Sequence, residues 1–130
     1  MKITSFNPLI ATKDAESIVS LFEALGFEKR HAPSNTAASG NDYTDYRMGD
    51  ANGFRVDVVN TAAKLERDIT SIRINVDDFD EVYKLLIDHG FKPQGGNPVT
   101  ESTSAKGLSM VSPSGFSISL VKHIKKEDRK

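Results

Sequence analysis

The sequence contains no cysteine, which excludes disulfides, thiolate-bound zinc, iron–sulfur clusters and thiol nucleophiles. It also has no tryptophan, but this absence excludes no class of site or function. No apolar run approaches the length of a membrane span, and the opening stretch MKITSFNPLIATKD lacks the apolar core of a signal peptide. We therefore expect a cytoplasmic protein with no membrane partner.

Neither sign of charge predominates, since 17 basic residues face 18 acidic ones for a formal net charge of -1. Nucleic-acid-binding domains are usually strongly basic, so the balance argues against a nucleic-acid partner. The 130 residues, 38% of them hydrophobic, are enough for one globular domain with a core that needs no covalent cross-link. We expect that domain to span residues 1–122, followed by a solvated charged tail over 123–130.

The chain repeats itself. At an offset of 64 residues the coinciding pairs include Ile10 and Ile74, Asp14 and Asp78, Leu21 and Leu85, Gly26 and Gly90, and Phe27 and Phe91. At an offset of 62 the coinciding pairs near the ends of the two halves are Met48 and Met110, Gly53 and Gly115, Phe54 and Phe116, and Val59 and Val121. Because these matches fall at expected element boundaries, they predict two tandem modules over residues 1–61 and 67–122.

Each module begins with an alternating apolar run that predicts a strand, followed by an apolar stripe with helical spacing. Asp14 and Asp78 stand where a helix N-cap belongs. Gly26 and Gly90 stand where a helix ends in the left-handed conformation. A short strand and a hairpin complete the module, so the sequence predicts an α+β fold of two βαβββ modules.

The first hairpin carries Asn52-Gly53, which favours a two-residue type I′ turn. A two-residue loop places Met48 across from Asp57 and Tyr46 across from Val59. The same argument applied to the second hairpin, with its Ser-Pro-Ser-Gly turn, places Met110 and Leu108 on the corresponding face. A one-residue slip in this register would exchange the two faces.

This pattern resembles the vicinal oxygen chelate superfamily of glyoxalases, bleomycin-resistance proteins and extradiol dioxygenases. The resemblance rests on INVDDFDEVYKLLIDHGF (74–91) and SPSGFSISL (112–120), with ATKDAESIVSLFEALGF (11–27) as the first-module copy. It implies that the modules form a curved, incompletely closed mixed sheet whose concave cleft holds a ligand. It also implies a homodimer, because many members of the superfamily dimerise.

Enzymes of this superfamily usually bind one divalent metal through His, Gln or Glu side chains at four strand positions. The resemblance maps these positions onto Asn7, Asp57, Ser71 and Ser119. Two serines and an asparagine supply no charge, and only Asp57 is an ordinary metal ligand. We therefore expect no metal and no other cofactor.

None of the three histidines, His31, His89 and His123, matches one of these positions. We expect them to have surface or structural roles. His89 falls near the end of the second helix, where the helix dipole favours a cation.

Alternation along the strands places Arg55 on the face of Asp57, and Arg73 on the face of Ser71. The opposite face is almost wholly apolar, so we expect it to pack against the helices. The ligand-binding residues predicted for the cleft are Asn7, Tyr46, Met48, Arg55, Asp57, Ser71, Arg73, Met110 and Ser119. Such a set suits a polar or anionic organic molecule, because an arginine fork matches carboxylate or phosphate. Alternatively, the arginines pair with Asp57 and close the cleft, or serve a dimer interface.

Two functions from different classes remain open at this point. The first is a metal-free protein that binds a small organic molecule, similar to the drug-sequestering branch that confers antibiotic resistance. The second is a lyase, isomerase or dioxygenase. It would be either metal-dependent through non-standard ligands or metal-free with Asp57 as the general base. A third interpretation is a degenerate copy whose cleft is filled by side chains and whose role is protein interaction.

Overall fold

The computed structural model describes residues 2–32, 34–36, 42–61, 65–94, 100–101 and 105–123. The chain divides into two compact units: an N-terminal unit of Asn7–Thr70, and a C-terminal unit of Met1–Phe6 with Ser71–Lys130. Apart from His123, the predicted tail lies outside the described residues. In these residues no helix has the length and hydropathy of a membrane span.

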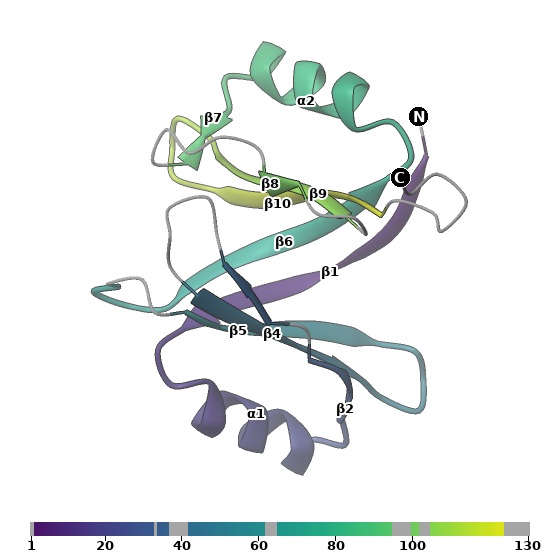
Figure 1. Cartoon of the computed structure of the whole chain (residues 1–130), viewed down its shortest axis with the longest axis vertical. Coiled ribbons are helices and arrows are strands. Elements are labelled where there is room, and N and C mark those ends of the chain that lie inside the picture. Colours follow the sequence, from purple (N-terminus) through teal and green to yellow (C-terminus); the bar gives the residue numbers. More distant parts are fainter. Residues whose placement is uncertain are drawn as a thin grey trace. The chain divides into compact units, whose positions relative to one another are not determined.

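The N-terminal unit contains one helix and the strands around it (Figure 1). Its elements are β1 (Ile3–Thr12, of which the part up to Phe6 belongs to the C-terminal unit), α1 (Ala15–Ala24), β2 (Glu28–His31), β3 (Ser34–Thr36), β4 (Asp42–Gly49) and β5 (Arg55–Thr61). The strand order is β2-β4-β5-β1, with β3 beside β4. β1 and β5 run parallel, whereas β4 runs antiparallel to β2, β3 and β5.

The C-terminal unit repeats this arrangement. Its elements are β6 (Ile69–Val76, of which Ile69 and Thr70 belong to the N-terminal unit), α2 (Phe79–Asp88), β7 (Lys92–Pro93), β8 (Thr100–Glu101), β9 (Ala105–Val111) and β10 (Ser117–His123). The order is β6-β10-β9-β7, with β8 beside β9 and with β6 parallel to β10. The predicted α+β class and the two βαβββ modules are therefore confirmed. Each module also has one additional short strand, β3 or β8, that the sequence analysis did not predict.

Both helices begin where the sequence predicts. The carboxylate of Asp14 accepts from the backbone N–H of Ser17 at 3.3 Å and from its hydroxyl at 2.8 Å. Asp78 accepts from the N–H of Glu81 at 3.0 Å. These bonds satisfy N–H groups that have no partner within a helix, and they fix the first residue of each.

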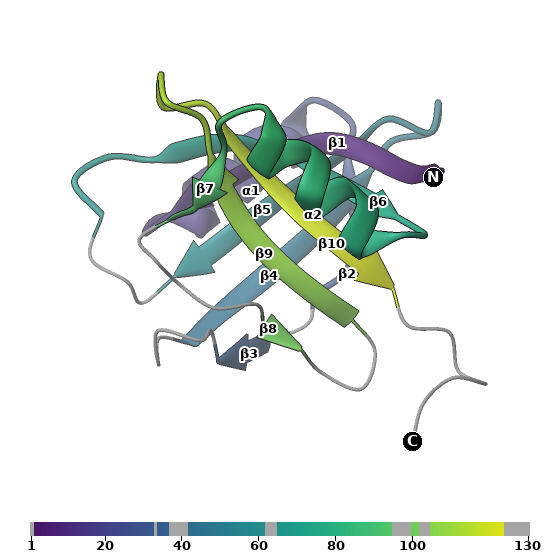
Figure 2. The same cartoon turned by 90° about the horizontal axis from the view of Figure 1, so that it is seen from above.

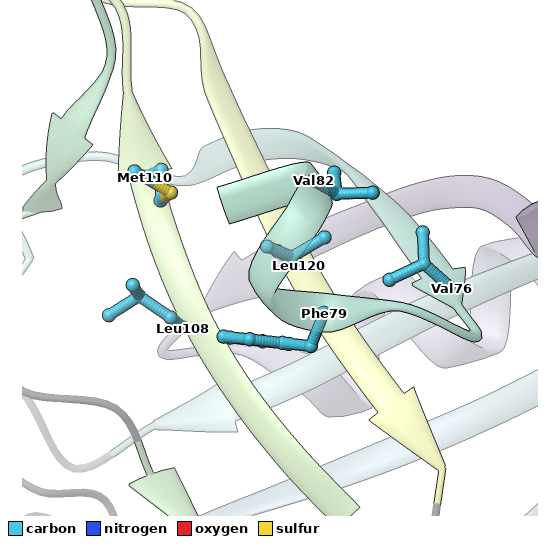
Figure 3. Close-up of a cluster of buried hydrophobic side chains, with 6 residues drawn as sticks. All are labelled: Val76, Phe79, Val82, Leu108, Met110 and Leu120. Atoms are coloured by element: carbon cyan, nitrogen blue, oxygen red, sulfur yellow. The ribbon is translucent and has the colours of Figure 1, made fainter. Parts of the chain in front are cut away.

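Each unit has its own apolar core between its helix and one strand face. The C-terminal core joins α2, β6, β9 and β10, and α2 lies over β10 (Figure 2). Its six buried members, drawn in Figure 3, are Val76, Phe79, Val82, Leu108, Met110 and Leu120. The N-terminal core comprises Ala15, Val19, Met48, Val56 and Val58. The helices therefore cover the apolar strand face, as alternation predicts.

The first hairpin differs from the predicted two-residue turn. Asp50 N–H donates to Phe54 O at 3.0 Å, which leaves a three-residue loop ending in Gly53 at φ 85°. The carboxylate of Asp50 accepts from Asn52 N–H at 3.0 Å and from Phe54 N–H at 2.8 Å. Among the described residues no side-chain-bearing residue has a positive φ, so Asn52 does not adopt the type I′ conformation.

The longer loop shifts the register of β4 by one residue. Met48 pairs with Val56 and Tyr46 pairs with Val58, whereas Arg47 pairs with Asp57. The second hairpin makes the same loop, because Ser112 N–H donates to Phe116 O at 2.8 Å and the hydroxyl of Ser112 accepts from Phe116 N–H at 3.0 Å. The predicted registers of both hairpins are therefore wrong by one residue.

Candidate functional site

The face of β1, β4 and β5 opposite the helix carries a group of polar side chains in the N-terminal unit. Asn7 and Asp57, only 5% and 3% exposed, are joined by a hydrogen bond of 3.0 Å from Asn7 Nδ2 to Asp57 Oδ1. The same Nδ2 donates to Pro8 O at 2.9 Å, so the amide is held from two sides. Asn7 lies on β1 and Asp57 lies on β5. These two strands pair in parallel, with Leu9 as the register partner of Asp57.

Two charged residues that the sequence analysis did not select lie on this face. Arg47 stands across from Asp57, and Asp45 stands across from Val59. Nε of Arg47 donates to Oδ2 of Asp45 at 3.1 Å, and the carboxylate side chain is only 10% exposed. Arg55, in contrast, lies at the exposed start of β5. The polar face of the N-terminal unit therefore comprises Asn7, Asp45, Arg47, Arg55 and Asp57.

The corresponding face of the C-terminal unit carries a buried arginine among small hydroxyl side chains. Arg73 is 8% exposed and is the register partner of Ser119, while Ser71 on the same strand is also 8% exposed. The hydroxyl of Ser117, a 5% exposed residue, donates to Gln94 Oε1 at 3.3 Å. The polar face of this unit therefore comprises Ser71, Arg73, Asn75, Ser117 and Ser119.

Three residues predicted to bind ligand lie on the other side of the strands. Met48 and Met110 are 2% and 0% exposed and belong to the two apolar cores, and Tyr46 packs against the N-terminal one. The reason is the hairpin register, since a shift of one residue sends every side chain of a strand to the opposite face. Leu108 lies in the C-terminal core for the same reason.

The histidines have positions consistent with surface roles. His89 follows the last turn of α2, where its Nδ1 donates to Leu85 O at 2.9 Å and so satisfies one of the helix's last carbonyls. His31 and His123 are exposed at the ends of β2 and β10.

The four positions at which the resemblance places metal ligands do not form a divalent-metal set. The Asn7 amide directs its N–H group, which cannot ligate a metal, toward the one carboxylate in the set, Asp57. The remaining two positions are Ser71 and Ser119, whose neutral hydroxyls are weak ligands for such ions. Within the described ranges, no three His, Cys, Asp or Glu side chains come together as a metal-binding group. The residues present therefore do not fit the metal.

Comparison with solved structures identifies the fold of this chain. No protein-family model matches the chain, and no curated protein is similar enough in sequence to count as a relative. Among solved structures, a glyoxalase/bleomycin resistance protein/dioxygenase superfamily member from Vibrio splendidus matches 95% of this chain and 100% of its own, at TM-score 0.57 and 14% identity. The chain has the vicinal oxygen chelate fold.

Other structures with the vicinal oxygen chelate fold have stated activities. A Streptomyces coelicolor methylmalonyl-CoA epimerase in complex with 2-nitronate-propionyl-CoA matches 95% of this chain and 100% of its own, at TM-score 0.62 and 18% identity. A glyoxalase I variant from Zea mays has TM-score 0.64 and 12% identity, and the match covers 93% of this chain but 43% of that one. At these identities the likeness establishes the fold alone.

Proposed function

We propose that this chain is a metal-free small-molecule-binding protein, whose ligand is a polar or anionic organic compound held against the polar strand faces. The observation that carries the proposal is the burial of polar side chains on strand faces that the helices do not cover. Burying a guanidinium or carboxylate is expensive unless it is paired, and such groups gather at functional sites more often than elsewhere. The residues proposed to contact ligand are Asn7, Arg55, Asp57, Ser71, Arg73 and Ser119.

Arg73 is the strongest single contributor to anion binding in this proposal. Its guanidinium has five N–H donors in a planar fork. A single neighbouring side chain cannot accept hydrogen bonds from all five. Ser119, its register partner, and Ser71 on the same strand supply hydroxyl groups that both donate and accept. A carboxylate or phosphate bearing further polar groups matches this combination.

The test is a thermal-shift screen of organic acids, phosphate esters and neutral polar compounds against chelator-treated protein. Hits are then measured by calorimetry with Arg73→Gln, with Ser119→Ala in case the first variant misfolds, and with Arg30→Gln as the control. Arg30 has a 54% exposed side chain and lies on β2. We expect at least a tenfold loss of affinity for Arg73→Gln and none for Arg30→Gln. Near-stoichiometric metal in the desalted protein, or unchanged affinity in both site variants, would contradict the proposal.

A second candidate function is metal-free acid–base catalysis with Asp57 as the base. The hydrogen bond from Asn7 favours it, because this bond orients a buried carboxylate. This is the lyase or isomerase alternative, now without a metal. Asp57→Asn would then abolish turnover of a ligand found in the screen while retaining its binding, whereas a pure binding protein shows no turnover in either form.

Two features of the protein follow from the resemblance and remain part of this proposal. Sequestration of a toxic compound such as an antibiotic is one form of the binding function, and survival of cells expressing the protein on graded antibiotic concentrations measures it. We also propose a homodimer, which sedimentation equilibrium checks directly.

A further inference from the structure

We propose that Arg47, held in place by Asp45, is a carboxylate-recognition residue whose ligand also carries a hydrogen-bond donor on the neighbouring carbon. The inference rests on the proposed binding function, and it names the chemical class of the ligand at the polar face of the N-terminal unit. It uses residues that the resemblance does not assign, because the hairpin register brought them to this face.

The orientation of the guanidinium is the first step. Asp45 lies two residues before Arg47 on β4, and its Oδ2 accepts from Nε at 3.1 Å. This carboxylate is 10% exposed, so it is a fixed anchor, whereas the arginine side chain is 34% exposed. Because Nε donates to Asp45, the two terminal nitrogens form the edge of the guanidinium that faces away from this carboxylate.

The terminal nitrogens provide the second step. In the part of the chain that the structure describes, the hydrogen bond and ion pair of Arg47 both run through Nε to Asp45. The two terminal groups of a guanidinium match the two oxygens of a carboxylate in a bidentate pair. A rigid, partly exposed arginine with its terminal edge available is therefore suited to such a ligand, and anchoring reduces the entropy that binding costs.

The neighbouring charge defines the rest of the ligand. Asp57 stands directly across from Arg47, and opposite residues in an antiparallel pair have Cβ atoms about 4.5–5.5 Å apart. The polar face of this unit carries two arginines and two aspartates, and a carboxylate bound at Arg47 would lie beside the carboxylate of Asp57. A simple anion is therefore opposed by Asp57. A hydroxyl or ammonium on the carbon next to the ligand carboxylate would instead donate to Asp57, so we infer a 2-hydroxy or 2-amino carboxylate.

The experiment follows the side-chain Nε–Hε resonance of Arg47 by NMR during titration with lactate, propionate and inorganic phosphate. Arg47→Lys identifies the resonance by its disappearance. We expect saturable shifts with lactate and binding at least tenfold weaker for propionate, which lacks the hydroxyl, and for phosphate. Asp45→Asn weakens lactate binding about three- to tenfold, because a neutral amide orients the guanidinium less firmly than a carboxylate. It also accelerates exchange of the Hε proton with water.

The controls separate this subsite from the wider proposal. Arg30→Gln should leave the lactate titration unchanged, and Arg47→Gln should abolish its effect on the neighbouring backbone amides of β4 and β5. Absence of a saturable lactate shift, or equal affinity for propionate and lactate, overturns the inference. If screened ligands lose affinity in Arg73→Gln but keep it in Arg47→Gln, the binding function stands and the Arg47 subsite is wrong.

Discussion

Arg47 on β4 lies directly across from Asp57 on β5, while the Asp57 carboxylate accepts a hydrogen bond from Asn7 on β1. Asp45 completes this row of polar side chains by accepting from Arg47 Nε. Three strands therefore contribute polar groups at low exposure to one sheet face. Each such contact has a measurable consequence for stability or binding.

Replacing Asn7 with alanine should lower the free energy of unfolding by about 1.5–3 kcal/mol, because it removes a hydrogen bond to a buried carboxylate. Urea denaturation measures the loss. Asn60→Ala, at an exposed position of β5, is the matched control and should stay within about 0.5 kcal/mol of the parent. Equal losses in the two variants would show that the Asn7–Asp57 contact does not stabilise the fold.

Met110→Ala should destabilise the C-terminal unit by about 2–5 kcal/mol, since Met110 is fully buried between α2 and its strands. Met110→Leu keeps nearly the same volume and should cost less than about 1.5 kcal/mol. Thermal or urea unfolding checks both values. A ligand contact at Met110 would instead appear as lost affinity with unchanged stability, and that outcome would contradict its assignment to the core.

Gly90→Ala should destabilise more than Gly53→Ala, although both glycines have positive φ values of 88° and 85°. A Cβ at Gly53 meets nothing within 4 Å, so its cost is the backbone conformation alone, about 1–2 kcal/mol. A Cβ at Gly90 would also lie 3.1 Å from Pro113 Cγ. Adding Pro113→Ala to Gly90→Ala should remove the excess, and a double-mutant cycle by urea denaturation measures it. An excess that survives in the double variant would exclude Pro113 as its cause.

Asp77 should make the protein lose stability in acid. The backbone N–H of Lys2 donates to its carboxylate at 2.7 Å and lowers the pKa of Asp77 below its ordinary value. A lowered folded-state pKa contributes stability that is present above the unfolded pKa, about 4, and is lost as the pH falls through the lower folded-state value. The free energy of unfolding of Asp77→Asn should therefore fall less between about pH 6 and about pH 2.5 than that of the parent. Parallel curves for Asp77→Asn and the parent would exclude this contribution.

The modules could be predicted because their boundaries depend on local chemistry. A side chain that caps a helix, as Asp14 and Asp78 do, acts on N–H groups two or three residues away, so the signal lies within a short window of sequence. The alternation of β6 and β10 likewise separated the apolar core from the polar face that includes Arg73 and Ser119.

The candidate site was predicted less completely, because it depends on how two strands align. Asn52-Gly53 is typical of a two-residue turn, yet the Asp50 carboxylate captures the N–H groups of Asn52 and Phe54 and stabilises a longer loop. The aspartate at the start of the turn was the signal that could have revealed this loop. With that register, Arg47 and Asp45 replace Met48 and Tyr46 on the face of Asp57.

The additional strands β3 and β8 had no comparable signal. They are short, and their existence depends on backbone pairing with β4 and β9 rather than on their own composition. Short segments of this kind are determined by tertiary context, which outweighs intrinsic strand propensity.

The three-residue loops also constrain how this chain can change. Each lies at an exposed hairpin end, where insertions and deletions are ordinarily tolerated. Here the loss of one residue near Gly53 would rotate β4 by half a period, burying Arg47 against α1 and exposing Met48 on the polar face. The length of this loop therefore determines the chemistry of the polar face as strictly as the identity of any residue on it. A library of variants with different loop lengths would sample β4 strands with exchanged faces rather than altered turns.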